Sequence, residues 1–335
     1  MKKFIKDLGV GEKIQSIFLL KNKELLRTKY DKPYLRLVLT DKTGEIEARV
    51  WEGAERMDKE IHSGQGVTVW GTVESWQNKI QFKIEGIREA LDDEYSREDL
   101  IRSVANIEEI FSKVKDCLEG ISDKWLLLLA EEFFCDSALM DKFKRSPGAK
   151  RWHNAYLGGL LEHTYEVMLI VEKVSSFHPE ANRDLALTGA FLHDMGKVQE
   201  LDPNTFEYTL EGGLIGHLSL SFELLSKKIS RIENFPKGLE LHLKHIILSH
   251  HGEYEQQSPV LPKTLEATIV YHADELVSQA NAIDELIQAQ SKLVLDSDRG
   301  GEQEWSNFVS IKNRKYLLKL PEKEDKTLLA PTGCK

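Results

Sequence analysis

The sequence predicts a multidomain protein in which an N-terminal all-β barrel precedes an all-α domain. Residues 1–92 contain short runs of alternating apolar and polar residues separated by turn signals, as the strands of a small barrel do. From Ile107 to about residue 320, apolar residues instead recur at intervals of three and four, the periodicity of packed helices. We expect the acidic residues 93–106 to form a linker and residues 321–335 to form a disordered tail.

The composition is that of a soluble globular protein, with 335 residues, enough for two or three domains. The net charge of −10 excludes a globally basic coat for nucleic acid, so a polyanion would need a local basic patch. Cys117, Cys135 and Cys334 show no Cys-x-x-Cys spacing and are typical of free thiols in a reducing compartment. No signal peptide and no apolar run long enough to span a membrane occurs, so we expect a cytoplasmic protein.

The barrel is predicted from strands and one short helix in a fixed order. A polar helix is expected at 53–62, and the turn Asp41-Lys42-Thr43-Gly44 joins two of the strands into a hairpin. Three strands, a helix and two further strands is the order of a five-stranded OB-fold barrel. The expected strands are 13–26, 33–40, 45–51, 66–73 and 79–84.

Aromatic and basic residues of the barrel are candidates for binding single-stranded nucleic acid, because bases stack on aromatic rings and phosphates pair with cations. For any single aromatic, a place in the barrel core is the more typical role. As a set they favour nucleic-acid binding, because several alternate with the apolar face. The candidates are Tyr34, Arg36, Trp51, Trp70 and Phe82.

A run of cations at 142–153 stands out in this acidic chain. It is broken by Pro147-Gly148, and we expect a loop that can hold phosphates. A solvated loop with no function is the alternative, but the run leads directly into a helix that carries His163, which favours a substrate role. The candidate residues are Lys144, Arg145, Lys150 and Arg151.

The stretch 190–197 is the centre of the predicted helical domain. An apolar run from Leu185 to Leu192 leads into His193 and Asp194, and such side chains are costly to bury unless they are paired or bound to metal. We expect Gly196 to end this helix and Lys197 to place a cation beside the pair.

Further potential ligands occur at helix-like positions along the chain. His163 lies among apolar residues, and Asp274 shares a helix face with Val270 and Val277. A lone buried histidine is usually a hydrogen-bonded core residue, and a lone aspartate is often a helix cap. Together with His193 and Asp194, however, they predict one buried polynuclear metal site. The full set is His163, His193, Asp194, His217, His250, His251 and Asp274.

The ordered motifs resemble those of HD-domain metal-dependent phosphohydrolases, and the additional histidines resemble the dinuclear branch of that superfamily. With the preceding barrel, nearly the whole chain is similar to the YhaM-type 3′→5′ exoribonucleases. The resemblance implies an all-helical catalytic domain, a divalent metal such as Mn, and release of nucleoside 5′-monophosphates. It is carried by residues 157–164 (LGGLLEHT), 193–197 (HDMGK), 216–218 (GHL) and 249–253 (SHHGE).

The resemblance also implies roles for the residues. Asp194 would bridge two metals, one held by His163, His193 and Asp274 and the other by His217, His250 and His251. Mixed imidazole and carboxylate ligands suit Mn, Fe, Co or Zn better than Ca or Mg. Lys197 and the basic run would neutralise the phosphate. His153, ten residues before His163, is a candidate to protonate the leaving 3′-oxygen or to hold the substrate.

Two other functions are compatible with parts of the pattern. A cyclic-dinucleotide phosphodiesterase would use a similar histidine set, but the Gly-Tyr-Pro signature of that family does not follow His251. A non-catalytic adaptor that binds single strands would not need the complete ligand set. We therefore expect hydrolysis of single-stranded RNA, with single-stranded DNA as a second substrate and a homo-oligomer as a possible assembly.

Overall fold

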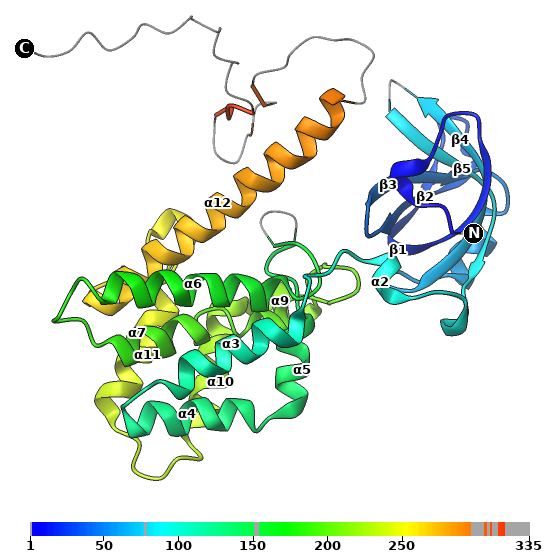
Figure 1. The fold of residues 1–335 in the computed structure, drawn as a ribbon. Coiled ribbons are helices and arrows are strands. Elements are labelled where there is room, and N and C mark those ends of the chain that lie inside the picture. The colour runs from blue at the N-terminus through cyan, green and yellow to red at the C-terminus, as the bar shows by residue number, and fades with distance from the viewer. Residues whose placement is uncertain are drawn as a thin grey trace, which may run out of the picture. The chain divides into compact units, whose positions relative to one another are not determined.

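The computed structural model describes residues 2–76, 79–150, 154–295, 305–306, 309 and 314–318. It divides the chain into two compact units, Met1–Val277 and Ser278–Lys335. The first unit holds a closed β-barrel and most of the helices (Figure 1). The predicted tail 321–335, together with Arg151 and His153 of the basic run, lies outside the described residues.

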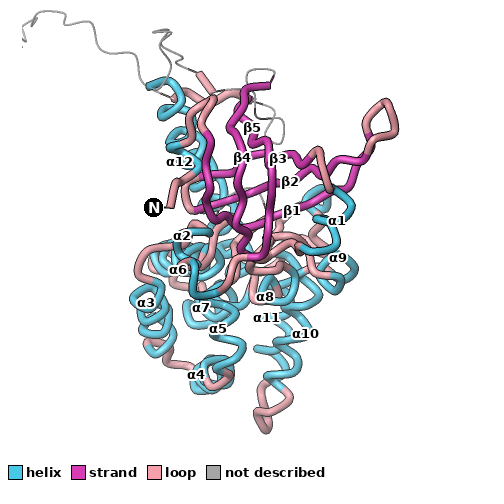
Figure 2. Tube along the Cα trace, turned by 90° about the vertical axis from the view of Figure 1, so that its right-hand side faces the viewer, coloured by secondary structure: helices cyan, strands magenta, loops and turns pink. Residues whose placement is uncertain are grey.

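The barrel confirms the predicted order of three strands, a helix and two strands. Its strands follow one another around the barrel as β1-β2-β3-β5-β4, and every neighbouring pair is antiparallel except β3 with β5 (Figure 2). The helix α1 (Ala54–Glu60) lies between β3 and β4 in the chain. The strands are β1 (Lys13–Arg27), β2 (Pro33–Asp41), β3 (Gly44–Val50), β4 (Gly66–Trp76) and β5 (Lys79–Glu89).

Alternation along the strands fills the barrel. Ile46, Ala48 and Val50 of β3 are buried, while the residues between them are at least partly accessible. The β2–β3 turn is held by Asp41, whose Oδ1 accepts hydrogen bonds from the backbone N–H and the hydroxyl of Thr43. Local turn chemistry therefore fixes the hairpin that the sequence predicted.

The acidic linker is more structured than expected. It contains a 3₁₀ turn (Asp92–Glu94) and the short helix α2 (Arg97–Leu100). Leu100 and Ile101 are buried in a small cluster with Leu19 of β1. The segment is therefore not merely solvated, because these two apolar residues anchor it to the barrel.

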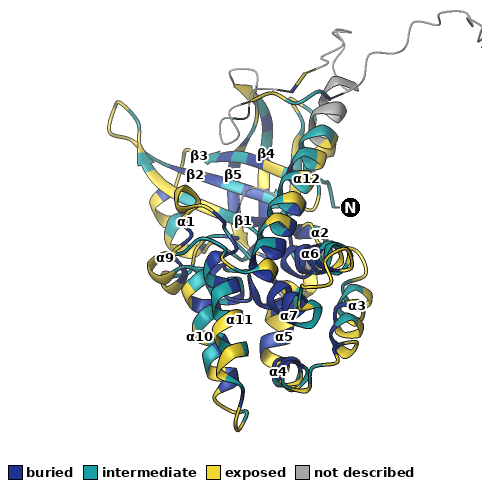
Figure 3. Cartoon of the chain, turned by 90° about the vertical axis from the view of Figure 1, so that its left-hand side faces the viewer, coloured by how far each residue is buried: buried dark blue, intermediate teal, exposed yellow. Residues whose placement is uncertain are grey.

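The helices of the second half bury one large apolar core. In α7 every residue from Leu185 to Leu192 is buried (Figure 3), so this helix is surrounded by others. Phe133 and Phe143 pack edge-to-face on Phe191 of α7, with ring centroids 5.8 and 5.9 Å away. The helices are α3 (Ile107–Glu119), α4 (Lys124–Phe134), α5 (Ser137–Arg145), α6 (Gly159–Ser175), α7 (Arg183–Leu192), α8 (Lys197–Glu200), α9 (Leu210–Ile215), α10 (His217–Ile229), α11 (Lys237–Ser249) and α12 (Leu265–Leu295).

Two local predictions need correction. The helix α7 ends at Leu192, before Gly196, and Gly196 has an ordinary helical φ of −64°. A Cβ on Gly196 would lie 2.3 Å from the carbonyl oxygen of His217, so this glycine allows α10 to approach closely rather than ending a helix. The basic run is also not entirely a loop, because Lys144 and Arg145 belong to the last turn of α5, where cations are favoured by the helix dipole.

Over the described part of the chain, no helix combines the length and the apolar character that a membrane span requires.

Candidate metal centre

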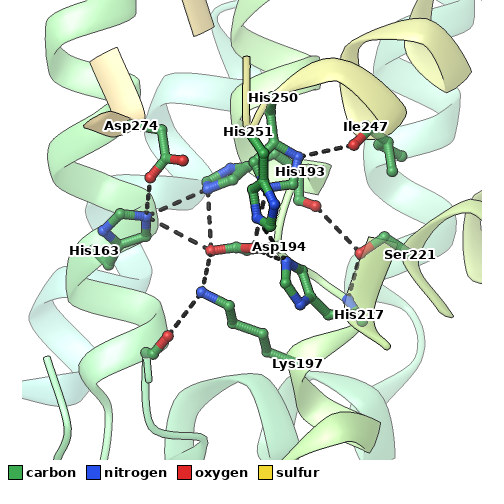
Figure 4. A network of polar contacts seen from close by, with 12 residues as sticks. His163, His193, Asp194, Lys197, His217, Ser221, Ile247, His250, His251 and Asp274 are labelled. Carbon is green, nitrogen blue, oxygen red and sulfur yellow. Dashed lines mark hydrogen bonds and ion pairs between the residues drawn. The ribbon is translucent and has the colours of Figure 1, made fainter. Parts of the chain in front are cut away.

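The predicted ligands come together from five helices. His163 lies within α6 and Asp274 within α12, whereas the others lie where α7 and α11 end and where α10 begins (Figure 4). The helices thus aim their side chains at one point inside the core. The ligands at these helix ends are His193, Asp194, His217, His250 and His251.

Asp194 is the centre of this arrangement, and its two carboxylate oxygens face different histidines. Asp194 Oδ2 lies 3.3 Å from His193 Nε2 and 3.7 Å from His163 Nε2. Asp194 Oδ1 lies 3.4 Å from the Nε2 atoms of both His217 and His250. One carboxylate therefore stands between two separate groups of imidazoles.

Each group is completed by one further residue. On the Oδ2 side, Asp274 Oδ1 lies 3.1 Å from His163 Nε2. On the Oδ1 side, His251 Nε2 lies 3.2 Å from His217 Nε2. Potential ligand atoms lie within 4.8 Å of one another in each of three sets: His163, His193 and Asp274; His193, Asp194 and His250; His217, His250 and His251.

The hydrogen bonds of the rings fix which nitrogen faces the centre. Nδ1 of His193, His250 and His251 lies 2.6, 2.8 and 2.9 Å from the carbonyl oxygens of Ala190, Ile247 and Gln256. A carbonyl only accepts, so each Nδ1 carries a proton, and a ring in its neutral form presents a bare Nε2 to its neighbours. Burial opposes the charge on His193, but Asp194 outweighs it and raises the pKa of this imidazole. Burial, with the nearby His250 and His217, lowers the pKa of His251 to about 3, and burial also lowers the pKa of His250.

These residues fit a divalent metal. Asp194 Oδ1 and His250 Nε2 are buried, and neither finds a hydrogen-bond partner within the described chain. Nδ1 of His217 and of His251 each face an acceptor, so in the neutral rings both Nε2 atoms are bare; 3.2 Å apart, they cannot satisfy one another, whereas a cation can bind both. The donor set of imidazoles and carboxylates is the one expected for Mn, Fe, Co or Zn.

Lys197 compensates the buried charge of Asp194. Its Nζ lies 2.7 Å from Asp194 Oδ2 and donates to the carbonyl oxygen of Gly148 at 2.8 Å. Burial opposes ionisation of Asp194, but Lys197 and His193 outweigh it and hold the pKa of this carboxyl well below its usual range. Burial likewise opposes the charge on Lys197, but Asp194 outweighs it and raises the pKa of the ammonium.

Sequence reasoning missed Glu200, the last residue of α8. Its Oε1 accepts from the backbone N–H of His217 at 3.0 Å and from His217 Nδ1 at 2.9 Å. His217 thus has a carboxylate partner where His193, His250 and His251 have backbone carbonyls, an arrangement that orients a ligand and increases its basicity. The sequence contained one indication of this role. Glu200 lies between the apolar residues Val198 and Leu201, both of which are buried, and a glutamate is rarely buried without a partner.

A cavity of about 510 Å³ opens beside the centre. Lys197 and two of the candidate metal ligands, His217 and His251, line it. Lys150 and Tyr208 line the same cavity. Of the predicted basic residues that the structure describes, Lys150 lines this cavity, whereas Arg145 lines a neighbouring cavity of about 670 Å³.

Lys144 is directed elsewhere. Its Nζ lies 3.0 Å from a carboxylate oxygen of Glu108 and 3.3 Å from one of Asp141, and it lies over the ring of Phe111. These contacts link α5 to α3. Lys144 is not in the described lining of the cavity beside His217, and its binding of substrate stays a prediction from the sequence.

The barrel residues that were predicted to bind nucleic acid lie in three different places, and three of them lie on one face. Tyr34 and Trp51 stack on each other with ring centroids 4.9 Å apart, and Trp51 is 43% exposed. Arg36, on the same strands, donates to Glu47, which also accepts from Arg49. These residues form the β2–β3 face, which is the usual binding face of an OB fold.

Trp70 and Phe82 do not share that face. Trp70 lies on β4, which pairs only with β1 and β5, and its indole covers Gly86. Phe82 is 0% exposed within the barrel core, so its prediction as a stacking platform was wrong. An exposed aromatic that the prediction omitted is Tyr30, 76% exposed in the β1–β2 loop between Lys29 and Lys32.

Comparisons with known proteins match both halves of the chain. A family model described as an OB-fold nucleic acid binding domain matches residues 20–90, and one described as an HD domain matches residues 160–278. The 3′-5′ exoribonuclease YhaM of Listeria welshimeri is 33% identical over 291 residues, which cover 86% of this chain and 92% of that protein. The protein of the same name from Listeria innocua is 32% identical over the same shares. Among solved structures, a replication protein A domain from Methanococcus maripaludis aligns with 27% of this chain and 94% of its own, with 21% identity and a TM-score of 0.24.

Proposed function

Because this chain belongs to the family of YhaM 3′-5′ exoribonucleases and is a metal-dependent enzyme of that class, we propose that its two domains have different roles in the reaction. The OB-fold domain holds a single strand, and the histidine–aspartate centre hydrolyses the phosphodiester next to the 3′ end. The domain limits 1–92 and 107–320, the cytoplasmic location and a homo-oligomer remain predictions from the sequence.

The proposed metal sites are the two groups of ligands around Asp194. His163, His193 and Asp274 would hold one divalent ion, and His217, His250 and His251 the other, with Asp194 shared. Bound there, the ions would supply Lewis-acid chemistry for hydrolysis at phosphorus. Mn is the proposed native metal, with Fe, Co and Zn as alternatives that the same ligands accept.

The protein groups prepare the site for a polyanion. The Nδ1 hydrogen bonds fix the imidazoles in orientation, so no ring has to reorganise during the reaction. The ammonium of Lys197 has three N–H groups, of which Asp194 and the Gly148 carbonyl accept two. Because Lys197 also lines the cavity, its remaining N–H is placed to donate to a phosphate oxygen.

The proposed products follow from the bond that breaks. Water adds to phosphorus, the bond from phosphorus to the 3′-oxygen of the preceding nucleotide breaks, and that oxygen takes up a proton. Each cycle then releases a nucleoside 5′-monophosphate and leaves a new 3′-hydroxyl. We assign the proton donor to His153, on its chain position ten residues before His163.

We propose that the single-stranded nucleic acid binds along the β2–β3 face of the barrel. The stacked pair of Tyr34 and Trp51 offers a ring surface, and the loop with Lys29, Tyr30 and Lys32 offers cations beside an exposed aromatic. Base stacking tolerates any sequence, because every base has a π-face. RNA preference would then depend on contacts to the 2′-hydroxyl, since attack by water does not require one.

The single observation that carries this proposal is the placement of Asp194 Oδ1 and Oδ2 against separate histidine groups. The test incubates the full-length protein with end-labelled RNA and DNA oligonucleotides and a panel of divalent metals. A 5′ label should give a descending ladder, and a 3′ label should appear at once as mononucleotide. Cleavage of circular RNA, or products with a 3′-phosphate, would contradict the proposal.

A further inference from the structure

The cavity beside the metal centre has one aromatic wall. Tyr208 is the only tyrosine, phenylalanine or tryptophan in its lining within the described chain, and 54% of the residue is exposed. The volume of about 510 Å³ lies within the range of roughly 300–1,000 Å³ that is usual for small-ligand sites. The cavity thus combines an accessible ring with the metal ligands His217 and His251.

The backbone of Tyr208 is tied to the segment that carries the centre. Tyr208 forms a β-bridge with Leu201, and the next residue, Thr209, donates its N–H to the carbonyl oxygen of Glu200 at 2.9 Å. The Thr209 hydroxyl donates to the carbonyl oxygen of Gln199 at 2.7 Å. Because Glu200 also holds His217, the ring of Tyr208 and this ligand are positioned by the same short helix.

A cation stands beside the ring. Lys150 Nζ lies 5.2 Å from the centroid of the Tyr208 ring and forms an ion pair with Glu207. Lys150 and Lys197 both line the cavity. An exposed ring for a base, with ammonium groups for a phosphate, is the chemistry that recognises a nucleotide.

We propose that this cavity binds the 3′-terminal nucleotide of the substrate, with its base stacked on the ring of Tyr208 and its phosphate toward Lys197 and the metal ligands. The inference rests on the proposed function, since it names the subsite in which that reaction would occur. Tyr208 is then a residue that distinguishes a nucleotide from a bare sugar phosphate. It does not select among bases, because stacking is tolerant of sequence.

The test measures binding of adenosine 5′-monophosphate and ribose 5-phosphate to the metal-loaded, full-length protein by calorimetry. The two probes share sugar and phosphate, so their affinity ratio reports the base alone. The wild type should prefer the nucleotide by about 5- to 150-fold, the range expected for one stacked base. Tyr208→Phe should keep this preference, whereas Tyr208→Ala and Tyr208→Leu should lose most of it without changing the affinity for ribose 5-phosphate.

The matched control is Phe177→Ala. Phe177 is also an exposed aromatic with a lysine 5.0 Å over its ring, but it does not line this cavity, so its removal should leave the ratio unchanged. Metal content confirms that each variant is folded at the centre. A Tyr208→Ala or Tyr208→Leu protein that keeps the wild-type ratio, or a wild type without a preference, would overturn the inference. RNA hydrolysis by the same wild-type sample is scored separately, so failure of the proposed function is distinguished from failure of this subsite.

Discussion

Lys197 Nζ lies 2.7 Å from Asp194 Oδ2, on the side of the carboxylate that faces His193. Both charges are buried in the helical core, so each is stabilised mainly by the other, with His193 adding to the stabilisation of Asp194 and the carboxylates of Asp274 and Glu200 adding to that of Lys197. The same ammonium also binds the carbonyl oxygen of Gly148 and so holds the loop before α6 against the centre. This pair therefore links the charge of the metal site to the shape of the cavity.

Replacing Lys197 by Met should separate its catalytic role from metal binding. We expect kcat to fall by about 10²-fold, the loss typical of one removed charge-stabilising donor, while bound metal is retained through the unchanged ligands. Metal-free Lys197→Met should be less stable than the metal-free wild type, because Asp194 loses its partner. Metal analysis, thermal unfolding and kcat are measured together, and loss of metal with no effect on kcat per bound metal would refute the assignment.

Glu200→Gln and Glu200→Ala should differ in metal affinity. Glutamine retains an oxygen that can accept from His217 Nδ1, whereas alanine removes the acceptor. We expect Glu200→Ala to weaken one of the two sites by about 10- to 100-fold, with a smaller effect in Glu200→Gln. Calorimetric titration with Mn²⁺ reports both sites, and equal binding curves for the alanine variant and the wild type would exclude a role for Glu200.

Trp51→Ala should weaken binding of a long single strand. One lost stacking contact predicts a rise in Kd of about 5- to 150-fold, with a smaller change in the cleavage of a dinucleotide, which offers the barrel little strand to bind. Trp70→Ala is the matched control, since Trp70 is 39% exposed but lies on β4, away from the β2–β3 face. Fluorescence anisotropy with labelled RNA gives the Kd of each variant. A larger loss of affinity for Trp70→Ala than for Trp51→Ala would place the binding face elsewhere.

Acid stability should depend on Asp136, which pairs with the buried Lys228 at 2.9 Å. The hydrogen bond from Lys228, helped by the N–H of Leu139, lowers the pKa of this carboxyl below its ordinary value of 3.8. Its contribution to stability is therefore present above about pH 4 and is lost as pH falls through the lowered pKa. Asp136→Asn keeps the α5 cap but removes the charge.

We expect Asp136→Asn to lower Tm at pH 6, and we expect its difference from the wild type to shrink as the pH falls below about 4. Thermal unfolding of both metal-free proteins across this range measures the difference, so that metal release does not contribute. A gap in Tm that stays constant down to the acid limit would show that the ion pair is not its cause.

Local chemistry explains which parts of the fold were predictable. The β2–β3 hairpin follows from Asp41 and its turn, and the ligand set follows from several histidines and aspartates at buried-type positions, which are costly to bury together unless they are paired or bound to metal. The sequence did not show whether the Phe82 side chain points into the barrel or toward solvent. Alternation along β5 defines two faces of the strand but does not tell which face lies inside. The register settles it, since Phe82 lies opposite the buried Ala48 and Val73.

Other features depend on packing between distant segments. Gly196 was expected to end a helix, but its role is set by the carbonyl oxygen of His217, twenty-one residues further along the chain. Glu200 is not one of the predicted metal ligands, and it contacts the centre through its hydrogen bonds with His217. A search of the sequence for the spacing of metal ligands therefore does not find it. Sequence periodicity shows which residues share a face of a helix. The roles of Gly196 and Glu200 depend instead on how separate helices pack against one another, which periodicity does not show.

The central claim is that Asp194 joins two metal sites that hydrolyse RNA from its 3′ end. It is tested most directly by measuring metal content per chain together with RNA turnover in the wild type and in Asp194→Asn. We predict about two divalent ions per wild-type chain, as in two-metal phosphodiesterases, and fewer in a folded variant that no longer releases nucleoside 5′-monophosphates. Undiminished turnover by Asp194→Asn, with its metal content unchanged, would contradict the account.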